Sequence, residues 1–381
     1  MQKEFWTFVL TFLMTLNVFN LAAQKGVTEY TIDLRTIVRL PLQLKESSGI
    51  AIENPNKIWT HNDSRNTNEL FAIDTLGEIV KTLKINNIDN IDWEDLAMDN
   101  EGNIYINDAG NNDNDRKNLA IHMINPVHET GGVIEAQSIN FTFEDQTAFP
   151  PPNANKNFDI EAIVWTNDTL FLFTKNRSNP FNGYSKVYRL PAQPGNQIAR
   201  LSDSVFLGSS TSEARVTAAT LNVANSVLAL LTSNKIIVFR NFSGTNFFSG
   251  QSTVYRFSAQ PGQVEAIDHV TDNTYYITSE GSNSQAGFLY EADLTGLTGI
   301  WPKNEHRIGF STEIRDDVLY LKLDDQYVNF ELIQLFSLSG VRIGHYETVN
   351  SIPLYGFNTG ILIINAYYRG NKHSQTIRLL R

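Results

Sequence analysis

One short motif recurs five times in this chain, and its spacing limits the folds that the chain can adopt. Each copy begins with polar residues and continues into an apolar run. The copies begin at Glu46, Asp92, Asp159, Arg215 and Gln263. We call the third residue of each copy the opener residue. The opener residues are Ser48, Glu94, Glu161, Thr217 and Glu265. Successive openers are 46 to 67 residues apart. Repeats of about 40 to 50 residues that hold several strands are typical of β-propellers. We therefore expect an all-β propeller over residues 27–300.

Each repeat has room for four strands. In the first repeat the apolar runs cover 49–52, 58–60, 70–73 and 79–83, with polar and turn-forming residues between them. Short runs bounded by Asp, Asn and Gly are typical of strands joined by tight turns. One repeat thus predicts one four-stranded blade.

The number of blades follows from how the ring closes. The last repeat has only three strands, at 264–268, 275–277 and 288–290, whereas a spare strand at 37–42 precedes the first opener. If this N-terminal strand completes the last blade, the ring closes with five blades and leaves only short edges unpaired. A sixth blade remains an alternative, built from 28–34 and the region 295–308.

The first 23 residues have the features of a secretory signal peptide. Lys3 precedes an apolar run over 5–21, and Leu21-Ala22-Ala23 lies before the polar Gln24. The alternative is a membrane anchor, because the run is nearly long enough to span a bilayer. We favour cleavage, which predicts a secreted or cell-surface protein without a transmembrane segment afterwards.

Composition excludes several classes of function. The net charge is −11 and the pI is about 5.1. Nucleic-acid binding needs clustered Lys and Arg to neutralise phosphates, so we expect no nucleic-acid partner. The chain has no cysteine, which rules out disulfides, thiolate chemistry and cysteine-ligated zinc.

The last part of the chain, 308–381, predicts a separate small antiparallel β-sandwich. Its apolar segments at 318–321, 332–336 and 361–364 alternate, with turns at Ser339-Gly340 and Asn358-Thr359-Gly360. The segments 332–342, 360–366 and 376–381 together resemble the C-terminal sorting domain of type IX secretion in Bacteroidetes. Leu362 departs from the tyrosine usual there. The resemblance implies transport across the outer membrane, with the type IX machinery as a partner.

A second resemblance covers the propeller. Trp59-Thr60-His61-Asn62-Asp63-Ser64, Asp92-Trp93-Glu94-Asp95-Leu96-Ala97, Asp108-Ala109-Gly110-Asn111-Asn112 and Leu172-Phe173-Thr174-Lys175 look like motifs of secreted Bacteroidetes propellers. That group is similar in outline to the SdiA-regulated and phytase-like esterase propellers. The resemblance implies fold and location and leaves the chemistry open.

The repeat also brings polar residues together. The start of the first strand and the end of the second lie at one end of the same hairpin, where facing Cβ atoms are about 5 Å apart. The five hairpins should therefore place their polar ends at one mouth of the central channel. The residues expected to bind a ligand there are Glu46, Asp92, Glu94, Asp159, Glu161, Lys175, Arg177, Arg215, Glu265 and Glu280.

Three interpretations of this mouth compete. The acids can serve only to satisfy buried backbone N–H groups. They can bind a divalent cation, with calcium favoured because it prefers hard oxygen ligands. The ligands expected for it are Glu94, Asp108, Glu161 and Glu265. The third interpretation is catalysis, with His61 and Asp63 as an acid/base pair and Lys175 and Arg177 stabilising an anion.

The leading expectation is a binding protein that takes an extracellular ligand or surface partner at this acidic mouth. The alternative is a calcium-dependent secreted hydrolase of phosphoesters or other esters, in which metal-bound water attacks the substrate. The fourth repeat departs from the acidic pattern, because it has Arg215 and Thr217 at two positions where every other repeat has at least one acid.

Overall fold

The structure is a computed structural model that describes residues 28–222, 224, 226–282, 284–295, 297, 310–323, 326–337, 342–357, 360–368 and 371–379. The expected signal peptide lies outside the described residues. The chain divides into two compact units, Met1–Gly299 and Ile300–Arg381.

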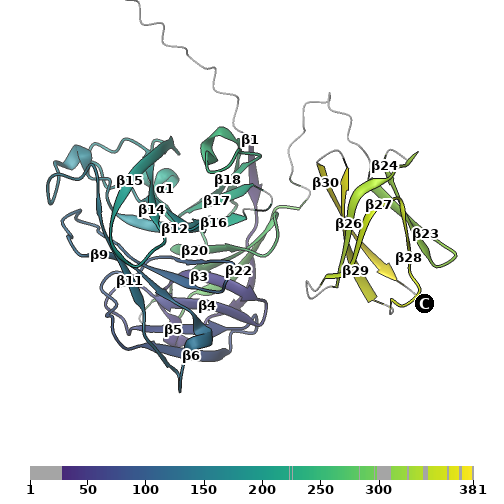
Figure 1. The fold of residues 1–381 in the computed structure, drawn as a ribbon. Helices are drawn as coiled ribbons and strands as arrows, with labels where there is room; N and C mark the ends of the chain where they lie inside the picture. Colours follow the sequence, from purple (N-terminus) through teal and green to yellow (C-terminus); the bar gives the residue numbers. More distant parts are fainter. Residues whose placement is uncertain are drawn as a thin grey trace, which may run out of the picture. The chain divides into compact units, whose positions relative to one another are not determined.

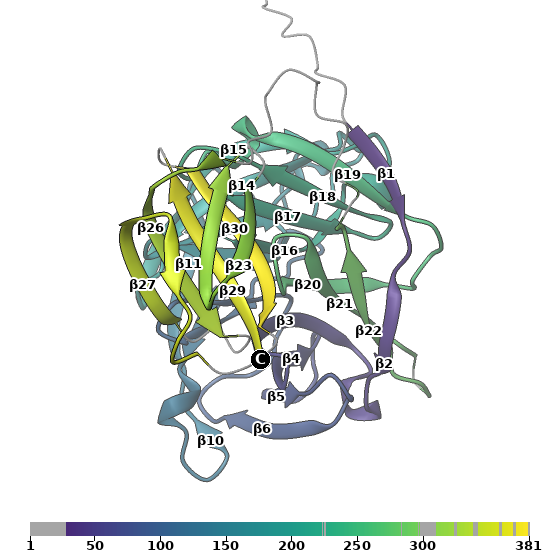
Figure 2. The same cartoon turned by 90° about the vertical axis from the view of Figure 1, so that its right-hand side faces the viewer.

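Strands of the first unit form five blades within its described residues, each with one strand near the middle of the unit and three further out (Figures 1 and 2). Blades 1 to 3 contain the following strands: β3 (Ser47–Asn54), β4 (Lys57–Asn62), β5 (Glu69–Ile73) and β6 (Ile79–Ile85); β7 (Leu96–Met98), β8 (Ile104–Asp108), β9 (Leu119–Ile124) and β11 (Gln137–Phe143); β12 (Ile160–Thr166), β13 (Thr169–Thr174), β14 (Tyr184–Pro191) and β15 (Gly195–Phe206).

Blades 4 and 5 complete the ring. Their strands are β16 (Val216–Asn222), β17 (Val227–Thr232), β18 (Lys235–Arg240) and β19 (Gln251–Phe257); then β20 (Val264–His269), β21 (Thr274–Ser279), β22 (Phe288–Asp293) and β2 (Arg35–Arg39). The N-terminal β2 pairs antiparallel with β22 from Arg35 with Glu291 to Arg39 with Phe288, and the register shifts between Thr36 and Val38. The predicted propeller, closed by its N-terminal strand, is confirmed.

The N-terminal part of the six-blade alternative, 28–34, is wrong, and its other part, 295–308, lies outside the described residues except for 295 and 297. β1 (Thr28–Ile32) pairs in parallel with β19 and so becomes a fifth, outermost strand of blade 4. Two more parallel pairings join outer edges. β10 (Val133–Ile134) extends blade 1 beside β6, and β11 pairs with β15, which merges blades 2 and 3 into one eight-stranded sheet.

Apolar cores between neighbouring blades hold the ring together. Each core takes side chains from two adjacent blades, and the one between blades 1 and 2 includes Trp59 and Trp93, both fully buried. The core between blades 5 and 1 packs Ala266 and Leu289 against Ile50 and Ile58. Because every adjacent pair shares such a core, the ring is closed by packing as well as by strand pairing.

The second unit is an antiparallel β-sandwich of two four-stranded sheets in its described residues. The sheets consist of β23 (Phe310–Arg315), β24 (Val318–Leu323), β25 (Gln326–Tyr327) and β28 (Ser351–Pro353), and of β27 (Arg342–Val349), β26 (Phe330–Ser337), β29 (Gly360–Tyr368) and β30 (Asn371–Leu379). Leu319 and Leu321 alternate on β24 and pack against Ile333, Leu335 and Ile364. The predicted sandwich is confirmed, while its predicted turns at 339–340 and 358–359 lie outside the described residues.

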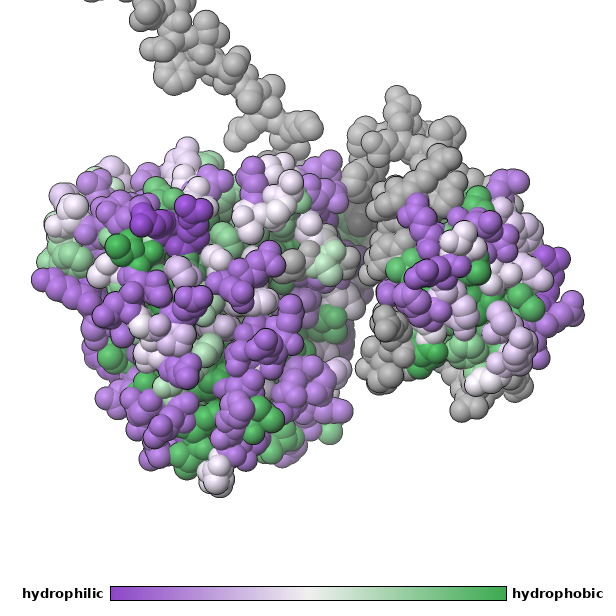
Figure 3. Space-filling view, viewed as in Figure 1, coloured by the Kyte–Doolittle hydropathy of each residue, from purple (hydrophilic) through white to green (hydrophobic). Residues whose placement is uncertain are grey.

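The described surface of the propeller is mostly hydrophilic on the face that Figure 3 shows, and apolar residues form smaller areas between polar ones. No helix in the described segments is long and apolar enough to cross a membrane.

Candidate functional site

A β-bulge lies at the opener residue of the inner strands. The pairing of inner and second strand shifts between Ser47 and Ile50 in blade 1, and at Glu161, Thr217 and Glu265 in blades 3 to 5. In blade 2 two residues also face one: Glu94 N donates to Asn107 O and Asn107 N donates to Asp95 O, both at 2.9 Å. Bulges redirect side chains next to functional sites. The recurring motif therefore encodes a recurring bulge.

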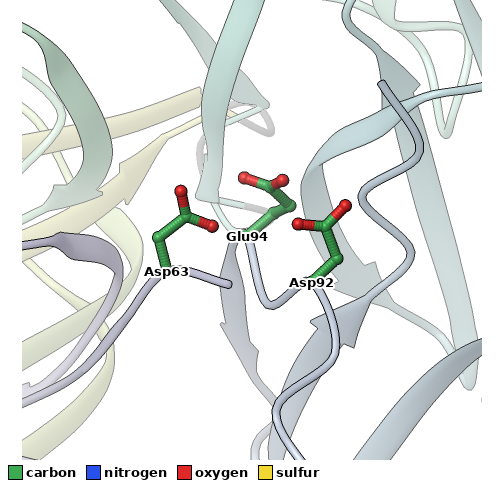
Figure 4. A group of neighbouring side chains, drawn as sticks. All are labelled: Asp63, Asp92 and Glu94. Carbon is green, nitrogen blue, oxygen red and sulfur yellow. The ribbon is translucent and has the colours of Figure 1, made fainter. Parts of the chain in front are cut away.

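Three carboxylates converge at this end of the channel. Asp63 follows β4, whereas Asp92 and Glu94 lie in the segment before β7, and one oxygen from each lies within 4.8 Å of the others (Figure 4). We call these residues the three-acid cluster. Their backbone is fixed by hydrogen bonds, since Asp63 N donates to Glu46 O at 2.8 Å and Asp92 N donates to the Asp108 carboxylate at 3.1 Å.

Glu94 is the buried member of the three-acid cluster. It is only 6% exposed, and no residue that the structure describes donates a hydrogen bond to its carboxylate or pairs with it as an ion. A buried carboxylate without a partner is costly, because it has lost its hydration without replacement. Glu94 must therefore either hold a proton or gain a cationic partner.

Gly110 forms the wall beside the three-acid cluster. A Cβ atom at this position would lie 2.6 Å from Asp92 Cγ and would also collide with a carboxylate oxygen of Glu94. A side chain would thus occupy the space in front of both acids. The glycine lets the backbone approach closely, as happens where a ligand is held.

Crowding of acids changes their protonation. Burial raises the pKa of Asp63 to about 7, and the charges of Glu161 and Asp92 add to this effect. Burial and the neighbouring Asp159 raise the pKa of Asp92 to about 6. Burial also raises the pKa of Glu94 well above its ordinary value, with Glu161 and Asp63 contributing. Without a cation, the cluster holds protons near neutral pH.

Lys175 and Arg177 lie beside the cluster but are already paired. Lys175 Nζ is 2.8 Å from Glu161 Oε2 and 3.8 Å from Glu265 Oε2. Arg177 donates to Asp159 at 2.6 Å and to Glu161 at 2.9 Å. Burial lowers the pKa of Lys175, but the nearby carboxylates outweigh burial and raise it. These cations neutralise part of the mouth without forming an ion pair with Glu94, while Asp92 Oδ2 lies 3.9 Å from Nη1 of a third cation, Arg116.

Among the other residues expected at the mouth, Arg215, Glu46 and Asp108 have separate partners. Arg215 donates to the backbone oxygen of Asn176 at 3.0 Å, and Glu46 accepts from Asn66 at 2.5 Å. Burial and Glu265 raise the pKa of Glu280 to about 8. Asp108 pairs with Arg116 at 2.9 Å and with His122 at 3.4 Å. Of the four residues expected to bind the metal, only Glu94 belongs to the close cluster.

The expected acid/base pair of His61 and Asp63 is not formed. His61 is fully buried, and its Nδ1 lies 2.9 Å from Asn62 O. Burial lowers its pKa to about 4, so the ring is neutral at physiological pH. Asp63 instead accepts from the backbone of Ser64 at 2.5 Å. Burial in the core beside Trp93 is the physical reason for this difference.

Sequence reasoning missed two residues that shape the site, Gly110 and Asp95. The side chain of Asp95 accepts hydrogen bonds from the backbone N–H groups of Leu96, Ile163 and Ala219, and so ties blades 2, 3 and 4 together. Asp95 lies in the motif 92–97 and Gly110 in the motif 108–112. Only their neighbours in the folded protein distinguish them from ordinary turn and strand-start residues.

Comparisons with known proteins give structural likenesses only. No family model matches the chain, and no curated protein matches it. A PQQ-bound aldose sugar dehydrogenase from Streptomyces coelicolor is 8% identical, with a TM-score of 0.42 over 69% of this chain and 98% of its own. A candidate gluconolactonase is 10% identical, with a TM-score of 0.36 over 78% of this chain and 91% of its own.

An extracellular domain from B. thetaiotaomicron, belonging to a candidate one-component system, is 11% identical. Its TM-score is 0.35 over 92% of this chain and 60% of that one. At these identities and TM-scores, the three likenesses assign neither substrate nor activity to the chain. The evidence for the five-bladed ring is the strand pairing within the structure itself.

Proposed function

We propose that this protein is an exported β-propeller that binds a divalent cation at the three-acid cluster, as part of an acidic mouth for an extracellular ligand. The observation that carries the proposal is the Glu94 carboxylate, which is buried, lacks a partner among the described residues and converges with Asp63 and Asp92. A cation would supply the missing partner and favour the ionised form of all three acids.

The spacing of the carboxylates suits calcium. Calcium binds oxygen ligands at about 2.3–2.6 Å, so two oxygens on one ion lie at most about 5 Å apart. The three acids meet this limit, with one oxygen each inside 4.8 Å. Water or an oxygen of the ligand would complete the six to eight positions that calcium takes. The same oxygen-rich set is less suited to softer metals.

Export and surface location belong to the same proposal. The N-terminal 23 residues have signal-peptide features, and the C-terminal sandwich resembles the type IX sorting domain. We propose that the sandwich engages the type IX machinery and that the propeller faces the extracellular medium. Extracellular calcium is abundant enough to occupy the weaker sites typical of extracellular modules.

The alternative, a metal-dependent hydrolase, has less support at this mouth. Lys175 and Arg177 are engaged by Asp159, Glu161 and Glu265, and His61 is buried and bonded to its own neighbour. Binding therefore fits the geometry better than ester hydrolysis does.

A luminescence titration tests the cation site directly. Trp93 stands between Asp92 and Glu94 in sequence, so excitation of tryptophan should sensitise terbium bound at the cluster, and calcium should displace it. Glu94→Gln should weaken terbium binding at least tenfold, whereas Glu144→Gln, which removes an acid that pairs with Arg200 elsewhere, should leave it unchanged. Equal binding by wild type and Glu94→Gln would overturn the proposal.

A parallel screen distinguishes binding from hydrolysis. Generic phosphoesters and carboxylic esters are incubated with the protein in the presence and absence of calcium. We expect no turnover above that of Glu94→Gln. Calcium-dependent turnover that disappears in this variant would favour the hydrolase instead.

A further inference from the structure

The opposite end of the channel carries a second ring of equivalent residues. Four positions after each opener residue, the five inner strands place the following half-buried side chains: Ile52, Met98, Trp165, Leu221 and His269. We call this ring the far mouth. Four of its members are large and apolar, and the fifth blade alone contributes a polar residue. This pattern is independent of the three-acid cluster, which lies at the starts of the inner strands.

A cavity of about 220 Å³ opens at the far mouth. All five members of the ring line it, together with small side chains such as Ala51, Ala97 and Ala219. Its volume equals that of roughly seven water molecules at about 30 Å³ each. Ligand sites commonly combine apolar walls with one or two placed polar groups. At the far mouth Thr220 and Asp268 also line the cavity, so polar groups contribute to its walls together with the four apolar side chains.

His269 is fixed in one orientation by the neighbouring strand ends. Its Nδ1 lies 2.7 Å from Thr220 Oγ1 and 3.1 Å from Asp268 Oδ1. Thr220 in turn donates to Asp268 at 2.6 Å, and the other oxygen of Asp268 accepts from Ile52 N at 2.7 Å. Because Thr220 gives its proton to Asp268, His269 Nδ1 is the donor in this network. Nε2, which has no hydrogen-bond partner among the described residues, remains for a ligand.

The charge state of His269 decides what Nε2 can bind. Burial lowers its pKa, but the hydrogen bond and charge of Asp268, together with the charge of Asp272, outweigh burial and raise the pKa above its ordinary value. When the ring is protonated, Nε2–H is a charged donor. Both carboxylate oxygens of Asp268 already accept hydrogen bonds, from Thr220, His269 and Ile52. The group that the His269 imidazole leaves free for a ligand is therefore a donor, Nε2–H.

We propose that the far mouth is a binding site for a small organic carboxylate. The carboxylate accepts a hydrogen bond from His269 Nε2–H, and the apolar part of the ligand packs against Ile52, Met98, Trp165 and Leu221. A charge-assisted hydrogen bond supplies the direction and the apolar ring excludes water from it. The site needs neither the three-acid cluster nor a metal.

Benzoate is a suitable probe, with the isosteric neutral benzamide as its matched comparison. The full chain, labelled at histidine, is titrated with each compound while the His269 ring resonances are followed by NMR. Benzoate should shift the His269 signals in a saturable manner, and benzamide should not. Binding should weaken as pH rises through the His269 pKa, because the neutral ring presents an acceptor to the carboxylate.

Three variants make the outcome decisive. His269→Gln should weaken benzoate binding at least about tenfold, as expected for the loss of one charge-assisted hydrogen bond. His122→Gln changes a propeller histidine that bonds Ser138 and Asp108 outside the cavity, and it should retain binding. Glu94→Gln should also retain it. Absence of a saturable His269 shift, or unchanged affinity in His269→Gln, would overturn the proposal whatever the result at the three-acid cluster.

Discussion

Gly110 matters because of what its missing side chain leaves open. A Cβ atom would stand 2.6 Å from Asp92 Cγ, so Gly110→Ala should displace the carboxylates and weaken calcium binding at least tenfold. Gly102→Ala is the control, since its Cβ would meet nothing within 4 Å. With φ at +81°, that control should cost about 1–2 kcal/mol of stability and leave affinity intact. Calorimetric titration with calcium measures the affinity of each variant, and equal affinities of Gly110→Ala and Gly102→Ala would contradict the prediction.

Asp63 should make stability depend on pH. Its pKa is about 7 in the folded protein against an ordinary value of 3.8, so between about pH 4 and 7 the folded state binds more protons than the unfolded state. The contribution of Asp63 to stability is therefore lost as pH rises through this window. Asp63→Asn removes the effect, and its stability relative to wild type should increase from pH 4 to 7 and then level off.

Urea unfolding of the calcium-free protein at several pH values measures this difference. Asp89→Asn, at an exposed position of the same unit, controls for the loss of a surface charge. Calcium should restore wild-type stability at pH 7.5 and have little effect on Asp63→Asn. A stability difference that is constant with pH would refute the assignment.

At the scale of elements, the inner strands depend on one another through Asp95. Its carboxylate joins the N–H groups of Leu96, Ile163 and Ala219, which belong to β7, β12 and β16. Asp95→Ala would leave these buried N–H donors without acceptors, and each unsatisfied buried donor costs about 1–3 kcal/mol of stability. Denaturant unfolding should show this loss, whereas exposed Asp89→Ala should change stability by less than about 0.5 kcal/mol.

The sequence predicts the elements whose signals are local. Polar openers followed by apolar runs identify the inner strands, and Ser48, Glu161, Thr217 and Glu265 all fall at a bulge. The pairing of β11 with β15 leaves no local signal, because parallel outer edges meet only after the blades have packed. Hairpin geometry is enough to predict that the polar residues gather at one mouth of the channel. The close grouping of Asp63 with Asp92, however, depends on how blades 1 and 2 pack against each other. The burial of His61 depends on the same docking.

At the scale of the whole molecule, the ring is stabilised by joining residues that are far apart in sequence. β2 pairs with β22 more than 240 residues later, through contacts such as the Arg35–Glu291 ion pair at 2.8 Å. β1 instead adds an outer strand to blade 4. Both strands are N-terminal, yet only β2 closes the propeller.

Two truncations separate these roles. A chain that begins at Leu34 lacks β1, and it should keep five complete blades and the amide protection of β22 in hydrogen exchange. A chain that begins at Leu40 also lacks β2, which leaves the edge of β22 unpaired and removes the contacts of Ile37 and Val38 with the core between blades 5 and 1. Those apolar contacts contribute about 3 kcal/mol or less, because both side chains are only partly buried.

Loss of β22 protection only in the shorter chain is the expected result, and it would place the closure of the ring in β2. Equal protection of β22 in both chains would show instead that the core between blades 5 and 1 closes the ring without it. The same pair of chains ties closure to the far mouth, because His269 ends β20 in the blade that β2 completes. Benzoate binding should accordingly survive the first truncation and weaken in the second.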